Sequence, residues 1–227
     1  MSHCTSRFVT TGRAVAAVSF ALLLVLSGLG VSPALLAPAL AEPGMYGDPA
    51  KAAQYWEYQT YDNNCALVSV AGVVGQITGS MPSEQEVIDL ARNTPSVKGG
   101  GRTVYEDENG HGVVTEDLPP LLLHYGIHST ISSDAQNDAA LTKLEGTLGS
   151  GHAVMVGVHA QTIWENAPPG ADDHELVVTG IDTVNSVAHL NDSGTERGRD
   201  LQVPISQFMS AWSADEFEMT VTSETVQ

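Results

Sequence analysis

Apolar positions in the first part of the chain recur at helical spacing. Residues 65–77 (CALVSVAGVVGQI) are apolar nearly all round, which predicts a buried helix that ends at Gly79. Residues 83–93 predict an amphipathic helix, because Ser83 and Glu86 form a capping box ahead of an apolar stripe. Two further helices are expected over residues 115–125 and 139–148.

Later in the chain the pattern changes to short apolar runs rich in β-branched residues. Four strands are predicted over residues 152–159, 175–181, 188–191 and 217–222, and a helix is predicted over residues 204–212. Helices therefore come first and strands second. This order predicts an α+β domain with an N-terminal helical part and a C-terminal, mostly antiparallel sheet.

The first 41 residues have the pattern of a cleaved secretory signal peptide. Arg7 and Arg13 precede an apolar run over residues 14–29, and Ala39-Leu40-Ala41 is a small-x-small cleavage site. Cleavage there predicts a mature chain that starts at Glu42 and is secreted or associated with the cell envelope. The alternative is a retained membrane anchor, although the run is short for a bilayer span. Residues 42–54 predict an irregular lead-in, and residues 55–227 a single domain.

The charge is strongly negative. The whole chain carries a formal net charge of −18, and both basic residues of the signal segment leave with it, so the expected mature chain carries −20. Such a surface argues against nucleic acid and anionic membranes as partners. Solubility outside the cell explains the charge adequately, and a preference for cationic substrates is the alternative. The charge does not indicate an oligomeric state.

Cysteine use is unusual for an exported protein. Cys4 leaves with the signal segment, so Cys65 is the one cysteine of the expected mature chain, and no intramolecular disulfide can form. A lone cysteine outside the cell is a buried inert thiol, an intermolecular bridge or a reactive nucleophile.

Four residues, Cys65 among them, bear on whether the cysteine is a nucleophile. Cys65 opens a helix, where the free N–H groups and the helix dipole lower the pKa of a thiol. His174 follows two aspartates at a strand start, and Asp192 lies 18 residues later, where a strand pair would bring it beside His174. The amide of Gln59 could join an oxyanion hole. Taken singly, each residue also has an ordinary structural interpretation: an apolar helix start, an exposed histidine, a plain turn or a polar loop.

In this order, the four residues and the motifs between them resemble the papain-like cysteine peptidases. The stretch 59–71 (QTYDNNCALVSVA) is similar to the Gln-x5-Cys segment of that family, and most similar to stand-alone relatives of the bacteriocin-processing, double-glycine-leader peptidases. Leu-x-x-Tyr-Gly at residues 122–126, Gly-x-x-Val-x-Val at 151–156, His-x-Leu-Val-Val-x-Gly at 174–180 and Asn-Asp at 191–192 follow in the same order. Asn64 and Ala66 depart from it, since the family more often has Asp and Gly there.

The resemblance implies a papain-like fold and a role for each residue: Cys65 as nucleophile, His174 as base and acid, Asp192 as the residue that orients His174, and Gln59 as oxyanion donor. It implies a peptide or protein substrate. Hydrolysis and acyl transfer would use the same residues, and a catalytically inactive fold that binds a peptide or cell-wall component is the alternative.

No cofactor or metal is expected. The chain has no HExxH motif, no CxxC pair and no GxSxG motif, and the acids near residues 107–110 depart from EF-hand spacing. The Gly-rich stretch 98–112 lacks a phosphate-binding pattern and predicts a surface loop. Trp164, in a polar stretch before His174, is the tryptophan expected to contact a ligand.

Overall fold

The computed structural model describes residues 44–107, 112–133 and 136–227. The expected signal segment and residues 108–110 of the acidic stretch 107–110 lie outside the described residues. The α-helices are α1 (Pro49–Ala52), α2 (Cys65–Thr78), α3 (Glu84–Asn93), α4 (Leu118–His124), α5 (Asn137–Gly149), α6 (Ala160–Glu165) and α7 (Ile205–Trp212). Three 3₁₀ turns accompany them, η1 (Ala53–Tyr55), η2 (Thr115–Asp117) and η3 (Ser213–Asp215).

The strands form one antiparallel sheet. They are β1 (Met45–Gly47), β2 (Ser129–Ser132), β3 (His152–Val158), β4 (His174–Asp182), β5 (Val187–Asn191), β6 (Leu201–Pro204) and β7 (Met219–Thr225). Their order across the sheet is β2-β7-β3-β4-β5-β6, with β1 paired to the far end of β4. The C-terminal strand β7 therefore lies inside the sheet, next to β3.

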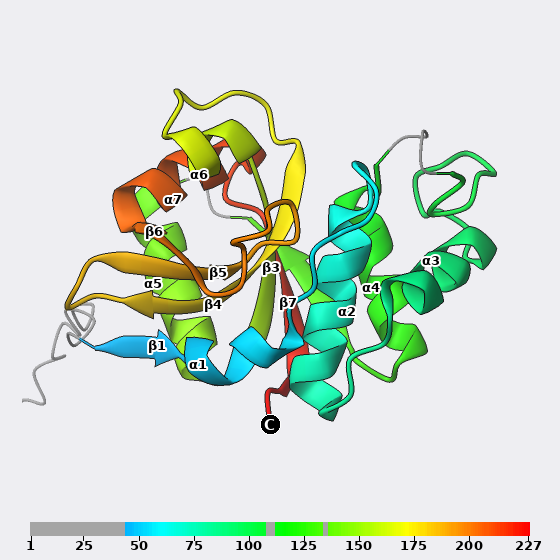
Figure 1. Cartoon of the computed structure of the whole chain (residues 1–227), viewed down its shortest axis with the longest axis horizontal. Coiled ribbons are helices and arrows are strands. Elements are labelled where there is room, and N and C mark those ends of the chain that lie inside the picture. Colours follow the sequence, from blue (N-terminus) through cyan, green and yellow to red (C-terminus); the bar gives the residue numbers. More distant parts are fainter. Residues whose placement is uncertain (1–43, 108–111, 134–135) are drawn as a thin grey trace, which may run out of the picture. The chain divides into compact units, whose positions relative to one another are not determined.

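Helices cover both faces of the sheet (Figure 1). One face packs against α2 and α4, with α3 packed against these two helices, and the other face packs against α5, α6 and α7. The central strand β3 serves both, because Val154, Val156 and Val158 point to one core while Ala153 and Met155 point to the other. Burial on both faces explains why this strand is a continuous apolar run in the sequence.

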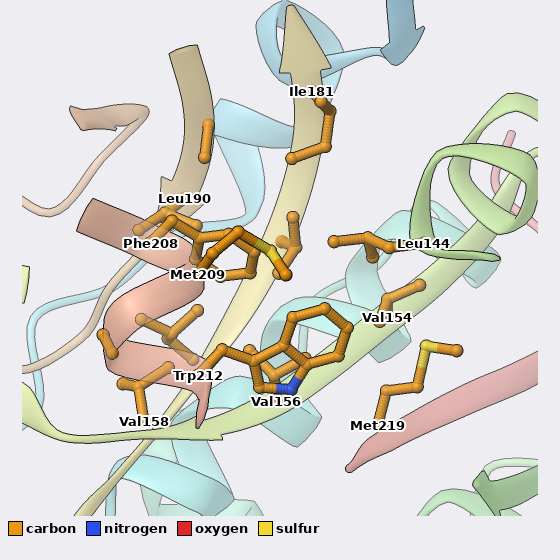
Figure 2. Packing of buried hydrophobic residues seen from close by; sticks show 14 of the residues in the cluster. Leu144, Val154, Val156, Val158, Ile181, Leu190, Phe208, Met209, Trp212 and Met219 are labelled. Atoms are coloured by element: carbon orange, nitrogen blue, oxygen red, sulfur yellow. The ribbon is translucent and has the colours of Figure 1, made fainter. Parts of the chain in front are cut away.

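A buried tryptophan, Trp212, anchors the end of α7 and the 3₁₀ turn η3 that follows it. Figure 2 shows Trp212, the last residue of α7, among the valines of β3. Its ring stacks on Phe208 at 5.5 Å and its Nε1 donates to the carbonyl of Glu218 at 2.7 Å. A fully buried, hydrogen-bonded tryptophan fixes the end of the helix, and with it the 3₁₀ turn η3 that follows.

The helix predictions hold closely, and the α+β class with an antiparallel sheet is confirmed. Ser83 caps α3 in a full capping box, and Gly79 ends α2 in the left-handed conformation. The lead-in over residues 42–54 differs from the expected irregular segment, because it contains β1 and α1. Strands β2 and β6 and helix α6 are further elements that the apolar pattern does not predict. In the part of the chain that the structure covers, no helix has the length and apolar character that a membrane crossing needs.

Candidate active site

Cys65 is the first residue of α2, and the loop before it is held by an acidic residue of α3. Glu84, at the start of α3, accepts hydrogen bonds from the Asn64 side chain and from the Thr60 backbone N–H, each at 2.6 Å. Asn64 is fully buried and precedes the helix without capping it through its side chain. Glu84 of α3 therefore holds the loop before Cys65 in place, and this positions the cysteine.

The thiol of Cys65 lies where its anion is favoured. The backbone N–H of Glu175 donates to Cys65 Sγ at 3.4 Å. Burial raises the pKa of the thiol, but hydrogen bonds from His174 and from the N–H groups of Glu175 and Ala66, together with the positive charge of His174, outweigh it and lower the pKa below its usual value. This favours a thiolate near neutral pH.

His174 begins β4 and is 8% exposed. Its Nε2 lies 2.7 Å from Asp192 Oδ1, which leaves Nδ1 as the ring nitrogen for the thiol. Burial alone would lower the pKa of the imidazole, yet its interactions with Asp192 and Cys65 raise that pKa to about 10. Both shifts favour an imidazolium beside a thiolate.

Asp192 is fully buried and follows β5, which pairs antiparallel with β4 in a register that sets Asn191 opposite Val177. Besides His174, its carboxylate accepts hydrogen bonds from Trp164 Nε1 and from the Gly194 N–H, each at 2.8 Å. Burial would raise the pKa of Asp192, but these hydrogen bonds and the charge of His174 lower it. The carboxylate is thus ionised and fixed in orientation.

Two residues close this pocket. The centroid of the Trp164 ring lies 5.4 Å from that of His174, and its Nε1 donates to Asp192, so Trp164 contacts both residues. The ligand contact predicted for Trp164 from the sequence stays a prediction. Gly194 packs so tightly that a Cβ there would lie 2.8 Å from His174 Cε1. A side chain at this position would displace the imidazole.

Gln59 is fixed near Asp192, and no interaction joins its amide to Cys65 among the described residues. Its Oε1 accepts from the Ser193 hydroxyl at 2.8 Å, and its Nε2 donates to the Tyr61 carbonyl at 2.7 Å. One hydrogen of Nε2 is left for another acceptor. The structure therefore brings Cys65, His174 and Asp192 together and holds Gln59 on the loop that leads to the cysteine.

Cys65 and His174 lie in the lining of a groove of about 570 Å³, and seven of its lining residues are acidic. Glu175 and Asp215 contribute to its lining, and sequence reasoning does not single out either of them as a site residue. Within residues 44–107, 112–133 and 136–227, no three His, Cys, Asp or Glu side chains are arranged to hold a metal ion.

The sequence of the chain is similar to those of two mycobacterial proteins. The chain is 41% identical over 235 residues to a protein of Mycobacterium tuberculosis and equally to one of Mycobacterium bovis, both described as uncharacterised; the match covers 95% of this chain and 100% of each relative.

Among solved structures, a Bacillus anthracis protein assigned as a C39-like peptidase superposes with a TM-score of 0.53 at 16% identity, over 76% of this chain and 95% of that one. A double-glycine-motif protease from an AMS/PCAT transporter, in complex with its leader peptide, gives a TM-score of 0.48 at 15% identity, over 74% and 89%. Residues 48–219 match the Peptidase_C39 like family, and the chain belongs to this family of papain-like cysteine peptidases.

Proposed function

We propose that this protein is an exported cysteine hydrolase that cleaves a peptide or amide bond with Cys65 as nucleophile, His174 as acid and base, and Asp192 as the residue that orients His174. One observation carries the proposal. A buried histidine is bonded at 2.7 Å to a fully buried carboxylate and interacts on its other side with a thiol at a helix start. Membership of the C39-like peptidase family supports the same chemistry.

The reaction follows from these positions. The Cys65 thiolate attacks the substrate carbonyl carbon, and a C–S bond forms as the carbonyl oxygen becomes an oxyanion. The backbone N–H of Cys65 and the remaining hydrogen of Gln59 Nε2 are the donors proposed for that oxyanion. The His174 imidazolium then gives its proton to the leaving amine, and the C–N bond breaks.

Release of the acyl group reverses the roles. Neutral His174 takes a proton from a water molecule, and the resulting hydroxide attacks the thioester. The C–S bond breaks, the Cys65 thiolate is restored, and the proton stays on His174. Asp192 remains ionised throughout, because its low pKa keeps it a carboxylate beside the imidazolium.

Export is part of the proposal and rests on the sequence. The basic and apolar residues 1–41 end in Ala39-Leu40-Ala41, which supports cleavage before Glu42. N-terminal sequencing of the protein from a culture medium or envelope fraction should therefore begin at Glu42. A product that retains Arg7 and Arg13 would contradict this part.

The hydrolase itself is tested with a proteome-derived peptide library. The mature protein should generate new peptide termini, detected by mass spectrometry, and the Cys65→Ala and His174→Ala variants should generate none above background. Thermal melting of the variants controls for loss of the fold. Cleavage that persists in Cys65→Ala would refute the assignment of the nucleophile. Library peptides that bind the wild-type protein and Cys65→Ala alike, without cleavage by either, would instead support the inactive, binding-only alternative.

A further inference from the structure

The groove beside Cys65 is more acidic than catalysis by a thiolate requires. The acidic residues of its lining are Asp62, Glu116, Asp172, Asp173, Glu175, Asp215 and Glu218. No lysine or arginine is among the described residues that line it. Lys98, outside the lining, pairs with Glu116 at 2.7 Å and also attracts Glu218. Negative charge next to a thiolate disfavours that thiolate, so the charge is unexplained by the reaction itself.

Glu175 lies closest to the chemistry. It follows His174 directly, and its backbone N–H donates to Cys65 Sγ. The residue is 8% exposed and lines the groove, and its Oε1 has no hydrogen-bond partner among the residues that the structure describes. Burial, with the negative charges of Cys65 and Asp215, raises the pKa of this carboxyl well above its usual value.

Asp215 approaches the same place from η3. Gly157 of β3 pairs with Glu175 of β4, and a Cβ at position 157 would lie 2.6 Å from Asp215 Oδ2. The missing side chain therefore makes room for the Asp215 carboxylate at the Glu175 position of the sheet. Asp215 Oδ2 also has no hydrogen-bond partner within the described part of the chain. Burial and the charges of Asp172 and Glu218 raise the pKa of Asp215 to about 7, although a hydrogen bond from the Gly157 backbone acts to lower it.

Two carboxylates with unpartnered buried oxygens destabilise a fold unless they are protonated or a bound group satisfies them. Two classes of group could do so, a metal ion or an organic cation. A metal ion requires several ligands converging on one point, and no such set occurs within the described residues. Carboxylates spread along a groove suit an ammonium or guanidinium group, which donates several N–H bonds in different directions.

We infer that the groove formed by Glu175, Asp215 and Glu218 beside Cys65 is a substrate subsite for an organic cation with N–H donors, as carried by a lysine or arginine residue next to the cleaved bond. That a peptide substrate delivers this cation rests on the proposed function. The subsite itself rests on the carboxylates alone.

Methanethiosulfonate reagents test the subsite, because they modify any accessible thiol and need no peptidase activity. The rate of Cys65 modification is measured for aminoethyl, trimethylammonioethyl and methyl methanethiosulfonate, each divided by its rate with free cysteine. The aminoethyl reagent should react at least about 10-fold faster than the neutral methyl reagent. It should also exceed the trimethylammonioethyl reagent, which carries the same charge without N–H donors.

Variants locate the effect. Asp215→Asn and Glu175→Gln should each remove most of the preference for the aminoethyl reagent. Asp138→Asn, which neutralises an exposed carboxylate of α5 that does not line the groove, should leave the preference intact.

Two results would overturn the inference. One is an equal effect of all three substitutions, and the other is equal acceleration of both cationic reagents, because either would reflect only the overall charge of the protein. Peptide cleavage without any preference for the aminoethyl reagent would leave the proposed function standing and reject the subsite. A clear preference for the aminoethyl reagent without peptide cleavage would support the subsite and reject the proposed function.

Discussion

The two sides of the Cys65–His174 pair carry carboxylates in opposite circumstances. On one side, both oxygens of Asp192 are bonded, to His174, Trp164 and Gly194, at 2.7–2.8 Å. On the groove side, Glu175 and Asp215 each have a buried oxygen that finds no partner in the described ranges of the chain. The pKa of Asp192 is lowered, whereas those of Glu175 and Asp215 are raised.

Hydrogen bonding, more than burial, separates the two regions. Asp192 is the most buried of the three side chains and is nevertheless the most stabilised as an anion, because its donors are built into the fold. One oxygen each of Glu175 and Asp215 has no donor among the described residues, and the proposed ligand supplies it. One side is therefore complete in the free protein, and the other becomes complete when a ligand binds.

Removal of Asp192 should have the largest effect. Asp192→Ala leaves an imidazolium and the Trp164 and Gly194 N–H groups without their acceptor, so we expect a loss of about 3 kcal/mol in the free energy of unfolding. Urea denaturation measures this loss. Asp192→Asn is the matched control, because it keeps the shape and one acceptor oxygen, and it should lose clearly less. An Asp192→Ala variant with the wild-type midpoint would contradict a structural role for this carboxylate.

Trp164→Phe should have a smaller effect in the same region. It removes the one indole hydrogen bond to the Asp192 carboxylate, which we expect to cost about 1.5–2 kcal/mol, since bonds to charged groups are the stronger ones. Trp56→Phe is the control, because Trp56 Nε1 donates at 2.7 Å to the neutral carbonyl of the same aspartate. Urea midpoints should rank Trp164→Phe below Trp56→Phe, and the reverse ranking would count against the charged acceptor.

Neutralising Asp215 should act in the opposite direction. Its pKa is about 7 in the fold and near 3.8 when unfolded, so the folded state binds the proton more tightly, and stability falls as the pH rises between these values. Asp215→Asn removes this penalty. We expect a gain of about 1 kcal/mol at pH 8, after allowance for the partial exposure of the group, and almost none near pH 4. A destabilised variant at pH 8 would show that Asp215 is satisfied in the free protein.

The sequence predicts the long elements of the fold better than the short ones. The long elements α2 and α3 are readable because a buried apolar run and a capping box are local signals. Strands β1, β2 and β6, of three or four residues, are too short to show an alternation, and helix α6 has only six residues. Their structure depends on tertiary packing that no local pattern encodes.

The same distinction applies to the site. Cys65, His174 and Asp192 stand in motifs whose order resembles a known family, so they can be named from the sequence. The groove is different, because Asp215 is 40 residues from Glu175 and only the register that sets Gly157 opposite Glu175 brings them together. Glu84 likewise looks like an ordinary first-turn acid of α3, although it holds the loop before the cysteine.

The most direct test of the central claim, a Cys65 thiolate paired with a His174 imidazolium, is the pH dependence of Cys65 alkylation by iodoacetamide. The lowered pKa of Cys65 and the His174 pKa of about 10 predict that the pair persists between them. The native protein should therefore gain its thiolate reactivity at a lower pH than the urea-unfolded chain, which should titrate at about pH 8.5, and should keep that reactivity up to about pH 9. His174→Ala should move the native curve toward that of the unfolded chain. A native thiol that titrates like the unfolded one, or that reacts more slowly than it throughout, would contradict the account.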